Sequence, residues 1–226
     1  MLSIEATSTT LILKGRIKME IKTPAINTSS EKKEKRVVIF DSCQFTIRGL
    51  TLLCERHADW RMCGTANSFS QLRKLLAQDR IDMVLCGIGN QLSDFSRLLN
   101  LPEYPIARCI LLTDKSSAVL RKTFLTAGFD AVVSKQTSIN ALDNLLHYQM
   151  HRPCGKANTS DTVGLYQPQE RDVLSALLNG QKPDAIAQEM GISYRTVSRY
   201  KQNGLKRAGL RSLNEILARQ KNYLSV

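Results

Sequence analysis

The sequence of 226 residues predicts two folded domains, a doubly wound α/β domain with a five-stranded parallel sheet and an all-α helix-turn-helix domain of four helices. Residues 36–149 alternate short apolar runs with segments whose apolar residues recur at helical spacing. Residues 150–164 are rich in Pro, Gly, Asn and Ser, as is typical of a linker. In residues 165–226 the apolar residues recur only at helical spacing. Residues 1–35 are polar and rich in Ser, Thr and Lys, so we expect a disordered N-terminal arm.

The strands and helices of the first domain follow from these two kinds of pattern. Continuous apolar runs predict buried parallel strands at Val37–Phe40, Arg61–Ala66, Met83–Cys86, Arg108–Thr113 and Ala131–Ser134. Helical spacing predicts a helix after each strand, around Ile47–Cys54, Phe69–Leu76, Leu92–Leu99, Ala118–Ala127 and Ile139–Leu146. Strands that alternate with helices in this way imply right-handed crossovers in a parallel sheet.

Four helices are expected after the linker. Their predicted ranges are Pro168–Leu178, Pro183–Met190, a helix from Ser193 to Gly209, and Leu213–Tyr223. Ser193 is a suitable N-cap, Gly209 is a suitable C-terminal stop, and the tight corner at Gly191 favours a helix-turn-helix. An ordinary helical bundle is the alternative interpretation.

The charge of the third of these helices indicates the class of partner that it binds. Six cations, and neither Asp nor Glu, lie between Ser193 and Arg211: Arg195, Arg199, Lys201, Lys206, Arg207 and Arg211. The whole chain has a net charge of +12, so an anionic partner is expected, and double-stranded DNA fits a short helix with one basic side. The alternative is an ordinary solvated helix face.

Residues 165–211 also resemble the LuxR/FixJ-type helix-turn-helix domain. The resemblance rests on Leu165, Pro168, Glu170, Val173-Leu174, Gly180, Ile186-Ala187, Met190 to Ser193, Thr196-Val197 and Gly209-Leu210. It implies base-facing positions for Ser198, Arg199 and Gln202, and phosphate contacts for Arg195, Thr196, Lys201, Lys206 and Arg207. Gly204 and Ala208 depart from the bulkier aliphatic residues usual in the family, which suggests a weakened helix or a gap filled by a partner.

The first domain is similar in pattern to a response-regulator receiver, which has a flavodoxin-like fold. The resemblance implies a phosphorylation pocket formed by Asp41, Ser42, Gly87, Thr113 and Lys135. The pocket is degenerate, because the acidic pair is only half present and glycine stands at the position of the phosphate-accepting aspartate. Asp82 and Asp94, the nearest carboxylates, are expected at the wrong end of the strand and in the next helix. We therefore predict a pseudo-receiver that is not phosphorylated at the usual site.

The segment 41–51 and the start of the basic helix resemble the RcsA-like auxiliary regulators within this family. The resemblance implies a phosphorylation-independent transcription regulator that acts as a homodimer or as a heterodimer with an RcsB-like response regulator. Residues 213–223 are the expected pairing helix, and RNA polymerase is a further candidate partner. No apolar stretch approaches the length of a membrane span, and the predicted location is the cytoplasm, in association with the nucleoid.

Two other functions remain open alternatives at this point. The chain could titrate a partner regulator without specific DNA binding of its own, or it could be a conventional phosphorelay regulator. The sequence has no Ser-His-Asp or Cys-His spacing that suggests covalent catalysis, and it has no glycine-rich phosphate-binding loop. We therefore predict neither an enzyme nor a cofactor. His147, His151 and Cys154 are the best metal candidates, but the third would lie beyond Pro153 and a fourth ligand is not evident, so no metal is predicted.

Overall fold

The computed structural model describes residues 34–78, 80–88, 92–114, 116–153 and 165–221, without the side chains of residues 92–94 and 218–221. Most of the expected arm, most of the expected linker and the expected end of the last helix at Tyr223 lie outside the described residues. The domain boundaries given above therefore remain predictions.

The α/β domain contains five parallel strands in the order β2-β1-β3-β4-β5. The strands are β1 (Lys35–Phe40), β2 (Trp60–Ala66), β3 (Ile81–Gly87), β4 (Ile106–Thr113) and β5 (Ala131–Ser134). This order is that of a flavodoxin-like doubly wound sheet, which confirms the predicted fold class.

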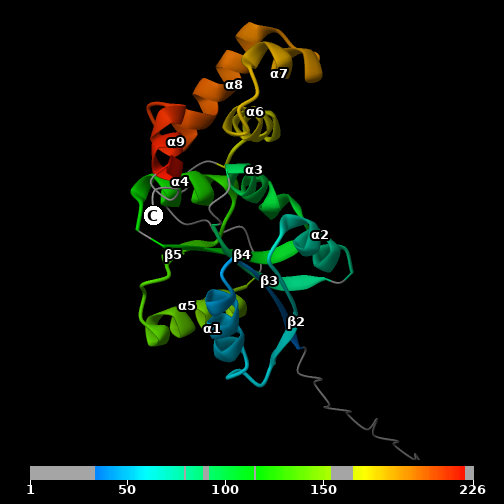
Figure 1. Ribbon diagram of the computed structural model, residues 1–226, viewed down its shortest axis with the longest axis vertical. Coiled ribbons are helices and arrows are strands. Elements are labelled where there is room, and N and C mark those ends of the chain that lie inside the picture. Colours follow the sequence, from blue (N-terminus) through cyan, green and yellow to red (C-terminus); the bar gives the residue numbers. More distant parts are fainter. Residues whose placement is uncertain (1–33, 79, 89–91, 115, 154–164, 222–226) are drawn as a thin grey trace, which may run out of the picture. The chain divides into compact units, whose positions relative to one another are not determined.

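Helices cover both faces of the sheet (Figure 1). They are α1 (Gln44–Cys54), α2 (Phe69–Gln78), α3 (Leu92–Leu99), α4 (Ala118–Ala127) and α5 (Ile139–His151), with a short 3-10 helix η1 (Leu101–Glu103). Alternate residues of one strand point to opposite faces, so Val38 and Phe40 pack toward α2, α3 and α4. Val37 and Ile39 pack toward α1 and α5.

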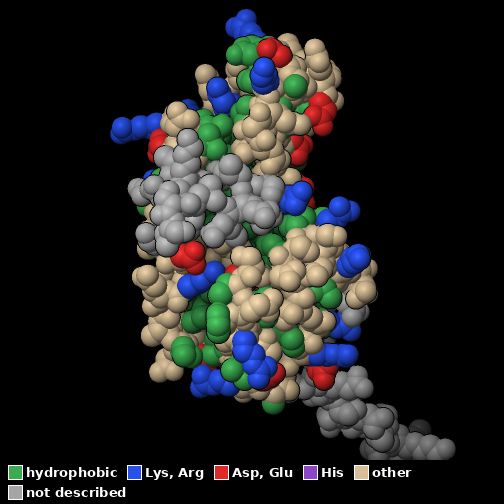
Figure 2. All heavy atoms as spheres, viewed as in Figure 1, with side chains coloured by type: hydrophobic (Ala, Val, Ile, Leu, Met, Phe, Trp, Pro, Cys, Tyr) green, Lys and Arg blue, Asp and Glu red, His purple; other side chains and the backbone are tan. Residues whose placement is uncertain are grey.

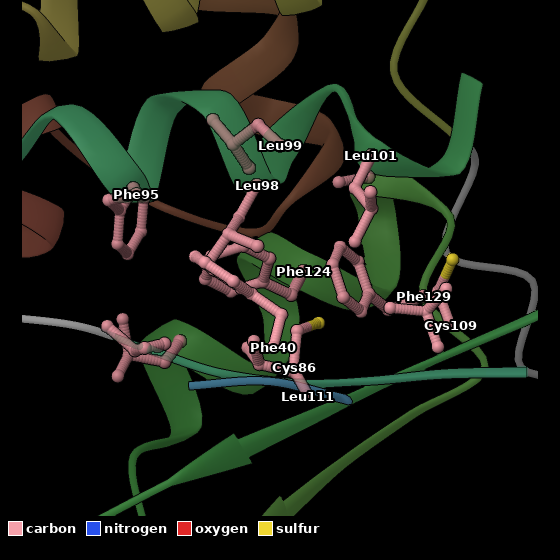
Figure 3. Packing of buried hydrophobic residues seen from close by; sticks show 14 of the residues in the cluster. Phe40, Cys86, Phe95, Leu98, Leu99, Leu101, Cys109, Leu111, Phe124 and Phe129 are labelled. Atoms are coloured by element: carbon pink, nitrogen blue, oxygen red, sulfur yellow. The ribbon is translucent and has the colours of Figure 1, made fainter. Parts of the chain in front are cut away.

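Aromatic side chains fill the core under α3 and α4 (Figure 3). The ring of Phe124 meets those of Phe95 and Phe129 edge to face, with centroids 4.8 and 5.1 Å away. These offset geometries are the favourable ones for aromatic pairs, so this cluster fixes α4 on the sheet.

The C-terminal region consists of α6 (Pro168–Leu178), α7 (Pro183–Glu189), α8 (Tyr194–Arg207) and α9 (Leu213–Lys221). These four helices confirm the predicted all-α region. A small core of four buried side chains joins α6, α7 and α8: Val173, Ile186, Ala187 and Val197. Other buried residues of this region, including Leu174 and Leu205, belong to the same hydrophobic cluster as the α3/α4 side of the sheet.

Candidate nucleic-acid interface and degenerate receiver pocket

The receiver-like pocket lies at the carboxyl ends of β1, β3 and β5, where parallel strands bring their following residues together. Asp41 follows β1 and is 1% exposed, and its Oδ2 lies 2.8 Å from Nζ of Lys135. Its Oδ1 accepts a hydrogen bond of 2.8 Å from the backbone N–H of Cys43. The carboxylate is thus held by one cation and one backbone donor.

Lys135 also lies 3.2 Å from the carboxylate of Asp114. Burial by itself would lower the pKa of Lys135, but the bonds to Asp41 and Asp114 outweigh burial and raise it. Lys135 is therefore a charged group at neutral pH, with two carboxylates beside it.

Gly87 ends β3 directly opposite Asp41. A Cβ atom built on Gly87 would overlap the carboxylate of Asp41, so the space that an acceptor side chain needs is already occupied. Of the other predicted pocket residues, Thr113 is buried at the end of β4 and Ser42 is exposed. Asp82 lies at the other end of β3 and accepts a hydrogen bond of 2.9 Å from the backbone N–H of Arg36.

The helix-turn-helix corner has the geometry that the sequence predicts. Gly191 follows α7 with a φ of 63°, a left-handed conformation that glycine adopts without strain. The side chain of Ser193 accepts a hydrogen bond of 3.1 Å from the backbone N–H of Thr196 and so caps α8. Together these residues set the direction in which α8 leaves the corner.

One side of α8 is buried against α6. Val197, Leu205 and Ala208 are between 1% and 6% exposed, as their spacing predicts. Gly204 is the point of closest approach, because a Cβ atom there would lie 2.7 Å from Cδ1 of Leu174. The expectation of a gap at Gly204 for a partner to fill is wrong, since Leu174 of the same chain fills it.

The opposite side of α8 is accessible to solvent. Arg195, Arg199, Gln202 and Lys206 are exposed, whereas Thr196, Ser198 and Lys201 are partly buried. Figure 2 shows Lys and Arg side chains at the surface around this helix. Arg195, Arg199, Gln202 and Lys206 thus lie on the accessible side of the helix, whereas Lys201 lies between the buried positions Val197 and Leu205.

Arg207 is the exception among the predicted phosphate contacts. Its Nε donates a hydrogen bond of 2.7 Å to Oε2 of Glu170, a residue of α6 that is only 2% exposed. The same carboxylate oxygen accepts a hydrogen bond of 3.0 Å from the backbone N–H of Gln167 and completes a capping box. The basic side is therefore not free of opposing charge, because a carboxylate distant in sequence engages Arg207.

Residues 167–219, which contain this corner and all of α8, match the family model described as bacterial regulatory proteins, luxR family. These residues are a LuxR-family helix-turn-helix domain. A comparison with curated proteins finds no match.

Several solved structures are similar to the chain beyond the LuxR-family domain. RcsB from Salmonella enterica serovar Typhimurium, bound to promoter rprA with the phosphomimetic BeF3-, is 17% identical over 85% of this chain and 100% of its own, with a TM-score of 0.48. Another Salmonella typhimurium RcsB structure is 16% identical over 84% and 98%, with a TM-score of 0.47. A response regulator from Thermotoga maritima is 14% identical over 52% and 98%, with a TM-score of 0.47.

The LuxR-family domain makes polar contacts with the α/β domain that the sequence does not reveal. The guanidinium of Arg171 donates hydrogen bonds to Oε1 of Glu103 at 2.6 Å and to the carbonyl oxygen of Ala127 at 3.0 Å. Ser96 of α3 donates a hydrogen bond of 2.5 Å from its hydroxyl to Oδ1 of Asn179, the residue that follows α6. Its carbonyl oxygen accepts a hydrogen bond of 3.2 Å from the hydroxyl of Ser175 in α6. We call these six residues the interdomain seam.

The three histidines of the sequence lie in one cluster away from both sites. His57 stacks on Trp60 and lies 2.7 Å from a carboxylate oxygen of Asp143, and the ring of His147 lies between those of His57 and His151. In the described part of the chain, no three metal-ligating side chains are arranged to hold an ion. Cys154 lies outside that part, so the sequence prediction about this metal candidate stays untested.

Among the described residues, none of the helices has the length and apolar character needed to cross a membrane.

Proposed function

We propose that this chain is a DNA-binding transcriptional regulator whose LuxR-family domain reads DNA without phosphorylation of the receiver-like domain. The observation that carries the proposal is the exposed, cationic side of α8 in a domain of this family. A helix of this size enters the major groove, and its cations reach bases and phosphates there. In this proposal Ser198, Arg199 and Gln202 face bases, and Arg195, Thr196, Lys201 and Lys206 approach phosphates.

Independence from phosphate is supported by the geometry of the receiver-like pocket. Glycine has no side chain that could accept a phosphoryl group, and the carboxylate of Asp41 occupies the space beside Gly87. Lys135, which in a working receiver would be available to a phosphorylated acceptor, is bound to Asp41 at 2.8 Å. The ion pair between Asp41 and Lys135 therefore keeps the pocket in a single arrangement.

The active species in this proposal is a dimer, either of two copies or of this chain with an RcsB-like response regulator. Two recognition helices that read half-sites on one face of DNA must lie about 34–36 Å apart, a distance that a pair of LuxR-family domains can span. Association with the nucleoid and contact with RNA polymerase would follow from promoter binding.

The decisive experiment measures DNA affinity as a function of salt. A duplex is first selected from a random library by the purified chain, and its affinity is then measured by gel shift between about 50 and 200 mM salt. We expect the affinity to fall steeply, because phosphate contacts release counterions. The double variant Arg199→Ala/Lys201→Ala should lose at least about 100-fold in affinity, which corresponds to roughly 3 kcal/mol for one base contact and one phosphate contact.

The matched control removes two charges elsewhere. Arg73 and Lys74 are exposed on α2, so Arg73→Ala/Lys74→Ala lowers the net charge equally without touching α8. We expect this control to bind within about twofold of the wild type. If both double variants bind as the wild type does, α8 is not the DNA-reading helix.

The alternative of a titrating protein without DNA binding loses its main support. A weakened α8 at Gly204 would favour that alternative, whereas Leu174 packs against Gly204 and makes it a buried contact. Co-purification with a partner regulator, without a footprint on DNA alone or together, would restore it.

A further inference from the structure

One helix of the receiver-like domain contains a glycine that no contact with the described residues explains. Gly49 lies in the middle of α1, where glycine weakens a helix relative to alanine. At Gly64 and Gly204, a Cβ atom would lie 2.8 and 2.7 Å from leucine side chains, so those positions have no room for a larger residue. A Cβ atom on Gly49, by contrast, would have no described atom within 4 Å. This glycine thus leaves open space beside α1.

The open space beside Gly49 belongs to a cleft between α1 and α5 with a volume of about 450 Å³. Ligand sites usually have volumes of roughly 300–1,000 Å³, and this one has room for roughly ten to fifteen non-hydrogen atoms. Most of its lining is aliphatic, from Leu50, Leu52, Leu53, Ile139 and Leu142. Leu52 and Ile139 are 49% and 65% exposed, and Figure 2 shows hydrophobic side chains at the surface over these two helices. An apolar occupant would remove this surface from water, which is favourable.

Two cations, Lys135 and Arg56, are the charged residues of the lining. Two carboxylates already engage Lys135. The side chain of Arg56 is 57% exposed, and the carboxylate of Asp143 lies 4.0 Å from it, which is too far for a hydrogen bond. Asp143 lies 2.7 Å from His57 instead. The donors of Arg56 therefore remain available to another acceptor, and the shape of a guanidinium matches that of a carboxylate.

We propose that this cleft binds a small amphipathic carboxylate, with the aliphatic body between α1 and α5 and the carboxylate on Arg56. Each property of the ligand follows from one feature of the cleft. The aliphatic lining selects the body, the volume limits its size, and Arg56 selects the negative end. Gly49 is necessary because a larger residue would occupy the space of the ligand. The site involves neither α8 nor a phosphoryl group, so it goes beyond the proposed function.

The first test titrates octanoate, below the concentration at which it forms micelles, into the full chain by isothermal titration calorimetry. We expect one site per chain with a Kd on the order of 100 μM, an affinity that a ligand of this size can reach. Octan-1-ol has the same aliphatic body without the charge, so it should bind at least about tenfold more weakly. Equal affinity for the two ligands would overturn the proposal, because the carboxylate would then play no part.

Two substitutions on α1 locate the site. Gly49→Leu fills the cleft and should weaken octanoate binding at least about tenfold. The fold should tolerate this change, since leucine is a better helix former than glycine, and the Tm checks it. Arg56→Ala should weaken octanoate about tenfold and alter octan-1-ol less than about twofold. The control Arg48→Ala removes an equal charge from an exposed position of the same helix outside the cleft, and both affinities should stay within about twofold.

A second copy of the chain is the competing occupant, since exposed apolar surface also attracts protein. Sedimentation velocity on the wild type and on Gly49→Leu, with and without octanoate, distinguishes the two. A wild-type dimer that Gly49→Leu dissociates, and that octanoate leaves intact, would assign the cleft to a second copy and overturn the proposal. The absence of binding heat up to about 1 mM octanoate would overturn it as well, as would wild-type affinity of Gly49→Leu for octanoate.

Discussion

Lys135 and Arg199 are both cations in places where a phosphate group is the expected partner, but their surroundings differ. Lys135 lies between the carboxylates of Asp41 and Asp114, at 2.8 and 3.2 Å. Arg199 is exposed on α8 and lies over the ring of Tyr200. The comparison shows that the neighbours of a cation decide whether it is available to a partner: two carboxylates engage Lys135, whereas Arg199 is exposed to solvent.

The largest effect is expected at the pocket. Lys135→Met should lower the free energy of unfolding by about 3 kcal/mol, because it leaves the buried carboxylate of Asp41 without its cation. Chemical denaturation checks this value, with Lys74→Met on the exposed side of α2 as the control that should change stability by less than about 0.5 kcal/mol. Equal stability of the two variants would show that the pair does not hold the pocket.

The same pair predicts a pH dependence. The pKa of Lys135 is raised in the folded chain, so its contribution to stability is complete below the pKa of an unfolded lysine, about 10.4. The contribution is lost as the pH rises through the raised pKa. The difference in stability between the wild type and Lys135→Met should therefore be constant from pH 7 to 9 and shrink above pH 10.

A smaller effect separates two neighbouring cations of α8. Arg207→Ala should destabilise the chain by about 2 kcal/mol, because the buried carboxylate of Glu170 loses a charged donor. Lys206→Ala should leave stability nearly unchanged but reduce the slope of log affinity against log salt by about 1. Thermal unfolding and gel shifts on both variants check this, and the reverse assignment of effects would contradict the distinction between them.

Gly204→Val should lower the free energy of unfolding by about 1–2 kcal/mol, because it places new atoms against Leu174 and overpacks the contact between α8 and α6. The added substitution Leu174→Val makes room, so part of the loss should be recovered in a double-mutant cycle. Strictly additive losses in denaturation would mean that Leu174 is not the neighbour that makes glycine necessary.

The smallest effect concerns the cysteines. Cys43 is exposed, and hydrogen bonding from Thr46 lowers the pKa of its thiol, whereas burial raises the pKa of Cys54 to about 12. An alkylating reagent at neutral pH should label Cys43 first and Cys54 only after unfolding, as mass spectrometry of a time course would show. Labelling of Cys54 at the same rate would contradict the burial of that thiol.

Local patterns in the sequence predict most of the fold. Apolar runs and helical spacing place each strand and helix within a few residues, because these signals come from neighbours in the chain. The capping role of Ser193 and the left-handed turn at Gly191 follow in the same way from residue type and position.

Contacts between distant residues are what the sequence could not supply. The pairing of Arg207 with Glu170 joins positions 37 residues apart, and Arg171 and Glu103 of the seam are 68 apart. A buried arginine cannot be told from an exposed one by its sequence neighbours, so neither the seam nor the packing of α9 against α4 carried a local signal. Gly204 was misinterpreted for the same reason, since its neighbour Leu174 belongs to another helix.

DNA binding without a phosphate switch can be tested in a single experiment. The affinity of the wild type for its selected duplex is determined before and after incubation with radiolabelled acetyl phosphate, with the bound label counted in the same sample. We expect no stable label and affinities that agree within about twofold, since Gly87 offers no acceptor and Lys135 is bound to Asp41. Stable label together with a tenfold change in affinity, both absent from an Asp41→Asn variant, would contradict it.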